Sequence, residues 1–191
     1  MRFHDDWLIQ TEIEQISKTK KVVNDYIKKI PKKKLKELST RGHYSKQYDL
    51  KYAFETQENF QFILENCAKK ITEEVEKRNG VDPEISLNNA WTVIGNTNSF
   101  HAVHRHKNAP QKIISTVMYL SAPPKNLKDE KLLDRGEFFY FLNKQDNRIL
   151  FNSVYPKTND FYIFPCWIWH GTYPQIKGIR QTLNIDFNVH N

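Results

Sequence analysis

The segment His101-Ala-Val-His104-Arg-His106, together with Phe164-Pro-Cys-Trp-Ile-Trp-His170, carries four of the seven histidines of the chain. His104 and His106 have the alternate spacing that a β-strand turns to one face. Two adjacent imidazoles and a distant third are a set of ligands with which a rigid sheet can hold a metal ion and leave other coordination positions open. We therefore interpret these segments as a candidate metal site.

The length and composition predict one folded domain over residues 1–191. Aromatic residues make up 13% of the chain and supply large surfaces for a core. Cys67 and Cys166 lie in segments without a cysteine motif and are interpreted as reduced interior residues. We find neither a leader pattern nor 18 consecutive apolar residues, so we expect a cytoplasmic protein that does not bind membranes.

The net charge of +7 comes largely from lysines in residues 18–51. A basic run can bind nucleic acid, but no aromatic residues are interleaved with these lysines in a recognisable binding motif. We favour a solvated helix face and do not expect nucleic acid as a partner.

Helical periodicity covers the first part of the chain, residues 1–81. The capping-box pattern Thr11-Glu-Ile-Glu14 predicts a helix from about 12 to 30, before Pro31. A short basic helix is expected at 32–38. Thr56 is expected to cap another helix, which Gly80 ends.

The pattern changes to short, aromatic and β-branched runs in residues 82–191. Strands are predicted at 85–94, 112–121, 137–143, 149–155, 161–164 and 181–189. Strands without intervening helices indicate a mainly β, cupin-like jelly roll buttressed by the N-terminal helices. In the last strand, Arg180, Thr182, Asn184 and Asp186 share a face that should line the cavity, and the residues between them should meet the helices.

An ordered set of features resembles the 2-oxoglutarate and Fe(II)-dependent dioxygenases. It consists of Trp91, His104-Arg-His106, Ser115-Thr-Val-Met-Tyr119, Gly136-Glu-Phe-Phe, Phe164-Pro-Cys-Trp-Ile-Trp-His170 and Gly178-Ile-Arg180-Gln-Thr182. More narrowly, it is similar to bacterial and phage members that carry His-x-His where most relatives have His-x-Asp or His-x-Glu. The resemblance covers roughly residues 88–190.

The resemblance implies a double-stranded β-helix that binds Fe(II) through His104 and His170. No Asp or Glu lies between Phe100 and Lys128, so His106 would replace the usual carboxylate ligand. Three neutral ligands leave the ion at +2, and a 2-oxoglutarate dianion would neutralise it. His101 is a second candidate for the third ligand, whereas Arg105 should point away from the metal.

The resemblance also assigns a cosubstrate site. Arg180 would bind the distal carboxylate of 2-oxoglutarate through its planar guanidinium, with Thr182 beside it. Tyr119 and Ser115 share a strand face and are candidates for the same site. The alternative for Arg180 is a salt bridge, for instance to Asp160 or Asp186.

Further residues are candidates for contact with the substrate or for supporting the ligands: His101, Trp91, Asn184 and Trp169. Trp169 is more readily explained as an aromatic that fixes the turn before His170. The polar segment 123–135 is expected to form a mobile loop over the cavity mouth.

These expectations describe an oxygenase, of the hydroxylase type, that uses O₂ and 2-oxoglutarate to oxidise a small molecule or a peptide. One alternative is a three-histidine, cupin-like metalloenzyme without 2-oxoglutarate, either a thiol dioxygenase or a zinc hydrolase. Against the thiol dioxygenase, no glutamate follows His106 closely, and the Arg180 and Thr182 pattern would be unexplained. Another alternative is a basic nucleic-acid-binding module with incidental histidines.

Overall fold

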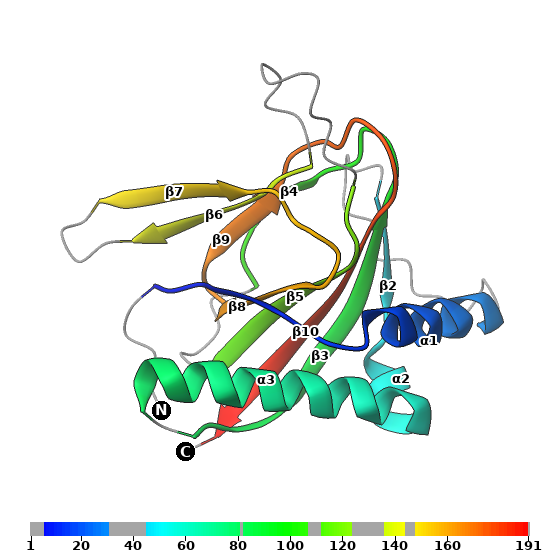
Figure 1. Ribbon diagram of the computed structural model, residues 1–191, viewed down its shortest axis with the longest axis horizontal. Coiled ribbons are helices and arrows are strands. Elements are labelled where there is room, and N and C mark those ends of the chain that lie inside the picture. The colour runs from blue at the N-terminus through cyan, green and yellow to red at the C-terminus, as the bar shows by residue number, and fades with distance from the viewer. Residues whose placement is uncertain are drawn as a thin grey trace.

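The computed structural model describes residues 6–30, 45–80, 82–106, 112–123, 136–143 and 148–190. Two antiparallel sheets face each other, and helices cover the outer face of the larger sheet (Figure 1). The helices are α1 (Ile16–Lys29), α2 (Lys51–Thr56) and α3 (Gln61–Asn79), with a 3₁₀ turn at Glu58–Phe60. The strands are β1 (Ile9–Glu12), β2 (Ser45–Asp49), β3 (Glu84–Gly95), β4 (His101–His104), β5 (Ile113–Ser121), β6 (Phe138–Asn143), β7 (Ile149–Val154), β8 (Asp160–Pro165), β9 (Trp169–Thr172) and β10 (Arg180–His190).

The larger sheet has the strand order β1-β8-β5-β10-β3-β2, and the smaller sheet has the order β4-β9-β6-β7. Every pairing is antiparallel, including the long pairing of β10 with both β3 and β5. Two facing antiparallel sheets of this kind form a double-stranded β-helix, or jelly roll. The prediction of a jelly roll with N-terminal helices on one sheet is confirmed.

The helices pack on the larger sheet because each presents one apolar stripe. Phe60, Ile63 and Ile71 are fully buried together with Leu183 and other strand residues in one hydrophobic core. The α3 helix ends at Gly80, whose positive φ of 66° places the cap in the left-handed region. The expected end of this helix is therefore confirmed.

The alternation of β10 separates this core from the interior of the jelly roll. Leu183, Ile185 and Phe187 belong to the core under the helices. A second cluster, which includes Tyr119, Phe138 and other residues of both sheets, fills part of the space between the sheets. The predicted division of the last strand into an apolar face toward the helices and a polar face toward the cavity is confirmed.

The starts of both long helices were predicted wrongly. Thr11 lies in β1, and just after this strand the backbone N–H of Ile13 donates to the carbonyl of Asn159. The helix begins only at Ile16, without a side-chain cap. Thr56 ends α2 instead of capping α3, and its hydroxyl donates to the carbonyl of Tyr52 at 2.7 Å. In both places, neighbouring backbone contacts outweighed the local capping pattern.

Among the described strands, β1, β2 and β9 were not predicted, and at β4 only the alternate spacing of His104 and His106 indicated a strand. Each has only four or five residues, which is too short for a clear alternation. The expected basic helix at 32–38 and most of the expected loop at 123–135 lie outside the described residues. No helix within the described ranges is both long and apolar enough to cross a membrane.

Candidate metal centre and cosubstrate pocket

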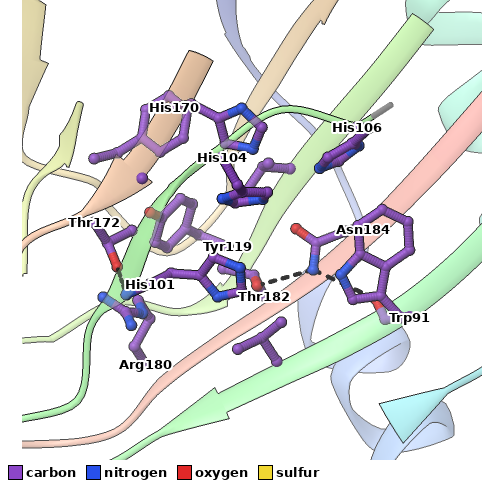
Figure 2. A pocket seen from close by; sticks show the side chains of 14 residues that line it. Trp91, His101, His104, His106, Tyr119, His170, Thr172, Arg180, Thr182 and Asn184 are labelled. Carbon is purple, nitrogen blue, oxygen red and sulfur yellow. Dashed lines mark hydrogen bonds between the residues drawn. The ribbon is translucent and has the colours of Figure 1, made fainter. Parts of the chain in front are cut away.

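Three histidines meet at one end of the smaller sheet, on the side that faces β10 (Figure 2). His104 ends β4 and is paired directly with His170 of β9. His106 lies two residues past the end of β4, where its backbone N–H donates to the carbonyl of Cys166 at 3.0 Å. The expectation that both His104 and His106 sit on one strand is therefore wrong, although the two rings still reach the same place.

The hydrogen bonds of these rings define which nitrogens face the centre. Nδ1 of His104 lies 2.8 Å from the carbonyl oxygen of Ala102, and Nδ1 of His170 lies 2.9 Å from that of Ile168. A carbonyl oxygen only accepts, so both rings carry their proton on Nδ1 and their lone pair on Nε2. Potential ligand atoms of the three histidines lie within 4.8 Å of one another. This arrangement fits a divalent metal ion.

The fold keeps His170 neutral. His170 is buried, and burial together with the neighbouring His104 and His106 holds its pKa well below 6.5. A histidine must be deprotonated at the ligating nitrogen to bind a metal. The low pKa thus prepares this side chain for coordination at neutral pH.

A pocket of about 410 Å³, including its open mouth, joins the three histidines to the polar face of β10 (Figure 2). It contains all but two of the residues that the sequence suggested for the site. The lining residues are Trp91, Val93, His101, His104, His106, Val117, Tyr119, Phe138, His170, Gly171, Thr172, Arg180, Thr182 and Asn184.

Arg180 is a charged residue of this lining, and no carboxylate of the described ranges pairs with it. Its side chain is 2% exposed, and both terminal guanidinium nitrogens lack a hydrogen-bond partner among the described residues. Burial lowers the pKa of the guanidinium, and the nearby Tyr119 partly opposes this shift. Asp160 instead accepts from Tyr162, and Asp186 pairs with His106, so neither supplies the alternative salt bridge in this structure.

Two hydroxyl groups lie near Arg180 in the pocket. The Tyr119 hydroxyl is buried and has no hydrogen-bond partner in the part of the chain that the structure describes, and burial raises its pKa so far that it stays protonated as a donor. Thr182 lies two residues from Arg180, and its hydroxyl accepts a hydrogen bond from Asn184 at 3.2 Å. A buried guanidinium beside unsatisfied polar groups is the environment expected for a bound carboxylate.

Ser115 and Trp169 are the two candidates that do not line the pocket. The Ser115 hydroxyl lies 2.9 Å from Nδ1 of His106, so it supports a histidine and does not face the cosubstrate pocket. Trp169 is 43% exposed and stacks under the Arg105 guanidinium at 4.9 Å. Both Trp169 and Arg105 therefore lie outside the pocket, as the sequence suggested for Arg105.

His101 and Trp91 occupy two sides of the pocket. The ring centroid of His101 lies 4.4 Å from that of His104, and its backbone N–H donates to the Thr172 hydroxyl. The Trp91 ring meets the His106 ring edge-on at 5.0 Å. His101 is not part of the close group of three histidines, although it remains near enough to contact a molecule bound beside them.

Sequence reasoning missed the partner of His106. Asp186 Oδ1 lies 3.0 Å from His106 Nδ1 across 80 residues of sequence. The alternation of β10 places Asp186 on the cavity face, but only the three-dimensional pairing shows which cavity residue it contacts.

The comparisons with known proteins agree with this geometry. Residues 89–188 match the model of the family described as "Putative 2OG-Fe(II) oxygenase". The chain belongs to this family. It is a non-haem oxygenase that uses Fe(II), 2-oxoglutarate and O₂. No curated protein matches the sequence significantly.

Solved structures of similar fold cover almost the whole chain. A prolyl-4-hydroxylase from Pseudomonas putida has a TM-score of 0.63 at 14% identity, over 96% of this chain and 93% of that chain. HygX from Streptomyces hygroscopicus, solved with nickel and 2-oxoglutarate, has a TM-score of 0.62 at 12% identity, over 97% and 84%. The 2-oxoglutarate-dependent epimerase SnoN has a TM-score of 0.69 at 9% identity, over 98% and 78%. At these identities the likeness shows the fold.

Proposed function

We propose that His104, His106 and His170 hold the Fe(II) of this oxygenase and that Arg180 anchors 2-oxoglutarate. The observation that carries the proposal is the buried Arg180 guanidinium, which finds no hydrogen-bond partner among the described residues and shares one pocket with the three histidines. A buried cation without a counterion is costly, so a dianion completes the site physically.

The neighbours of Arg180 suit the distal carboxylate of 2-oxoglutarate. The planar guanidinium can donate two parallel hydrogen bonds to a carboxylate, which an ammonium group cannot do. The Tyr119 hydroxyl is available to donate a third, and the Thr182 hydroxyl lies on the same side of β10. In this arrangement the cosubstrate extends from Arg180 toward the histidines.

We assign His101, Trp91 and Asn184 to the substrate side of the pocket. All three line the pocket beside the proposed metal ligands. When bound, Fe(II) and 2-oxoglutarate supply the activation of O₂. The residues of this chain orient the cosubstrate and substrate and surround them with a partly apolar lining that includes Val93, Val117 and Phe138.

The reaction we propose is hydroxylation of a small molecule or a peptide. The fold neighbours include a protein named as a prolyl-4-hydroxylase, which supports this type, and one named as an epimerase, which represents another outcome of the same chemistry. We further propose a cytoplasmic enzyme with one catalytic domain over residues 1–191. Two buried cysteines that form no disulfide support a reducing compartment.

The rival enzyme is a three-histidine metalloenzyme that binds no 2-oxoglutarate. It leaves the buried guanidinium of Arg180 without a role. The rival binding module needs neither the histidine cluster nor this guanidinium, and we do not propose nucleic acid as a partner.

The decisive experiment is a titration with 2-oxoglutarate under anaerobic conditions with Fe(II), followed by measurement of uncoupled succinate formation in air. Arg180→Lys keeps the charge and loses the planar fork. We expect it to weaken 2-oxoglutarate binding by about 1.5 to 3 kcal/mol, or about 10- to 150-fold, while Fe(II) still binds.

The matched control is Arg105→Lys, because Arg105 stacks on Trp169 outside the pocket. This variant should bind 2-oxoglutarate like the wild type. Equal 2-oxoglutarate affinity in the wild type, Arg180→Lys and Arg180→Ala would show that Arg180 is structural and would remove the main support for the cosubstrate site.

A further inference from the structure

His106 differs from the other two histidines in what holds its second ring nitrogen. His104 and His170 face backbone carbonyl oxygens through Nδ1. His106 Nδ1 instead lies 3.0 Å from the Asp186 carboxylate and 2.9 Å from the Ser115 hydroxyl. The side chains of His106 and Asp186 are only 12% and 10% exposed, so water screens this contact weakly.

The carboxylate decides the tautomer of His106. An ionised carboxylate only accepts hydrogen bonds, so Nδ1–H must donate to Asp186 and is shared with the Ser115 oxygen. The lone pair of the neutral ring then lies on Nε2, as it does in His104 and His170. All three rings thus present the same kind of nitrogen to the centre, and among the contacts of the described residues it is His106 that bonds to a carboxylate.

The hydrogen bond from His106 to a carboxylate matters because of the charge at the metal site. Three neutral imidazoles do nothing to offset the charge of a divalent ion, and no carboxylate joins the close group of ligand atoms among the described residues. A carboxylate bonded to the far side of a ligand ring fixes the ring and increases its strength as a donor. The Asp186 charge therefore reaches the metal position through the His106 ring.

We propose that Asp186 is a positioning residue that orients His106 and supplies, through its hydrogen bond to the far side of this ring, the negative charge that a three-histidine site lacks. This inference rests on the proposed metal role of His104, His106 and His170. Ser115 shares the Nδ1 proton but contributes no charge, so its contribution is smaller.

The test measures metal affinity with Co(II) under anaerobic conditions, by chelator competition and by the visible absorption bands of the bound ion. Asp186→Asn keeps the shape and an accepting oxygen but loses the charge. We expect it to weaken Co(II) binding about 10- to 100-fold, the range for outer partners of metal ligands. Ser115→Ala keeps the carboxylate and should stay within about threefold of the wild type.

Asp160→Asn is the matched control, because Asp160 is another buried carboxylate of the larger sheet and bonds to Tyr162, not to a histidine. It should bind Co(II) like the wild type. Equal losses in Asp186→Asn and Asp160→Asn, or in Asp186→Asn and Ser115→Ala, would overturn the inference.

A test of Asp186→Asn in a second variant protein, His106→Asp, shows whether Asp186 acts through His106 or only stabilises the fold. His106→Asp replaces the imidazole with a direct carboxylate ligand and removes the N–H that Asp186 accepts. In this background Asp186→Asn should change Co(II) affinity less than threefold, whereas a structural role would produce the same loss in both backgrounds. If His106→Asp binds no Co(II), the comparison of Asp186→Asn with Ser115→Ala decides.

The two proposals fail in different ways. His170→Ala should abolish stoichiometric Co(II) binding, and unchanged binding there would mean that the metal site itself is misplaced. Loss of binding in His170→Ala with unchanged affinity in Asp186→Asn would leave the metal site in place and reject the role of Asp186 alone.

Discussion

His170 shows how the fold prepares a ligand before any metal is bound. Its ring is buried beside two other histidines, and its pKa lies well below the ordinary value of 6.5 because burial and these neighbours disfavour the charged form. The unfolded chain exposes the same ring to water, where it takes up a proton at about pH 6.5. Folding and protonation of His170 therefore oppose each other.

This opposition predicts a pH dependence for the metal-free protein. Below pH 6.5 the unfolded state binds a proton that the folded state does not, so the free energy of unfolding should fall as the pH drops from 7 toward 5.5. The contribution of one such group is at most about 1.4 kcal/mol per pH unit. Urea denaturation of metal-free protein across this range measures it. His170→Gln should flatten the slope, and an unchanged slope would mean that another group controls it.

At the scale of the elements, strands with clear alternation could be predicted from the sequence, and short paired strands could not. The face of β10 that carries Arg180 follows directly from the period of a strand. The β4 and β9 strands carry two of the proposed ligands, but each has only four residues. Their pairing joins residues 66 positions apart, and no local pattern encodes such a contact.

Contacts between residues far apart in the sequence could not be predicted within the site either. His104, His106 and His170 were singled out by their spacing, and the role of Arg180 was implied by the resemblance to the oxygenase family. The hydrogen bond between Asp186 and His106 could not be predicted from the sequence, since it depends on how β10 lies behind the segment after β4. The predicted start of α1 was wrong for a related reason: β1 takes Thr11 and Glu12 of the capping pattern into the sheet.

The absence of a side chain at Gly171 lets β9 lie close to its neighbours. We therefore predict that a larger residue at this position disturbs the metal site. A Cβ atom at this position would lie 2.7 Å from a ring carbon of Phe139 in β6 and 2.8 Å from the carbonyl oxygen of His101 in β4. Gly171→Ala should therefore displace β9 and the adjacent His170. We expect Co(II) affinity to fall at least tenfold, measured by chelator competition.

Gly80→Ala, at the end of α3 and away from β9, is the control for this prediction. Gly80 adopts a positive φ of 66°, but an added Cβ would meet nothing within 4 Å. It should cost about 1 kcal/mol of stability through backbone strain and leave Co(II) affinity unchanged. A Gly171→Ala protein that binds Co(II) normally would show that β9 tolerates the shift.

At the scale of the whole molecule, the two faces of the larger sheet have different roles, one in folding and the other in ligand binding. Its outer face, with the helices, forms the main hydrophobic core, and its inner face lines the pocket with polar residues (Figure 1). Buried polar groups such as the Arg180 guanidinium and the Tyr119 hydroxyl lack partners within the described chain. The fold thus gives up stability on the inner face that bound ligands are expected to restore.

This division predicts stepwise thermal stabilisation by the two ligands. A ligand that binds only the folded state at 100 times its dissociation constant adds about 2.7 kcal/mol, which in a chain of this size raises the Tm by about 5 to 11 °C. Under anaerobic conditions Fe(II) should raise the Tm, and 2-oxoglutarate should raise it further only when the metal is present. Arg180→Lys should keep the first increase and lose most of the second at the same 2-oxoglutarate concentration. Loss of both Tm increases in this variant would mean that Arg180 supports the fold of the whole pocket. A rise in Tm with 2-oxoglutarate in the absence of metal would place the cosubstrate away from the three histidines.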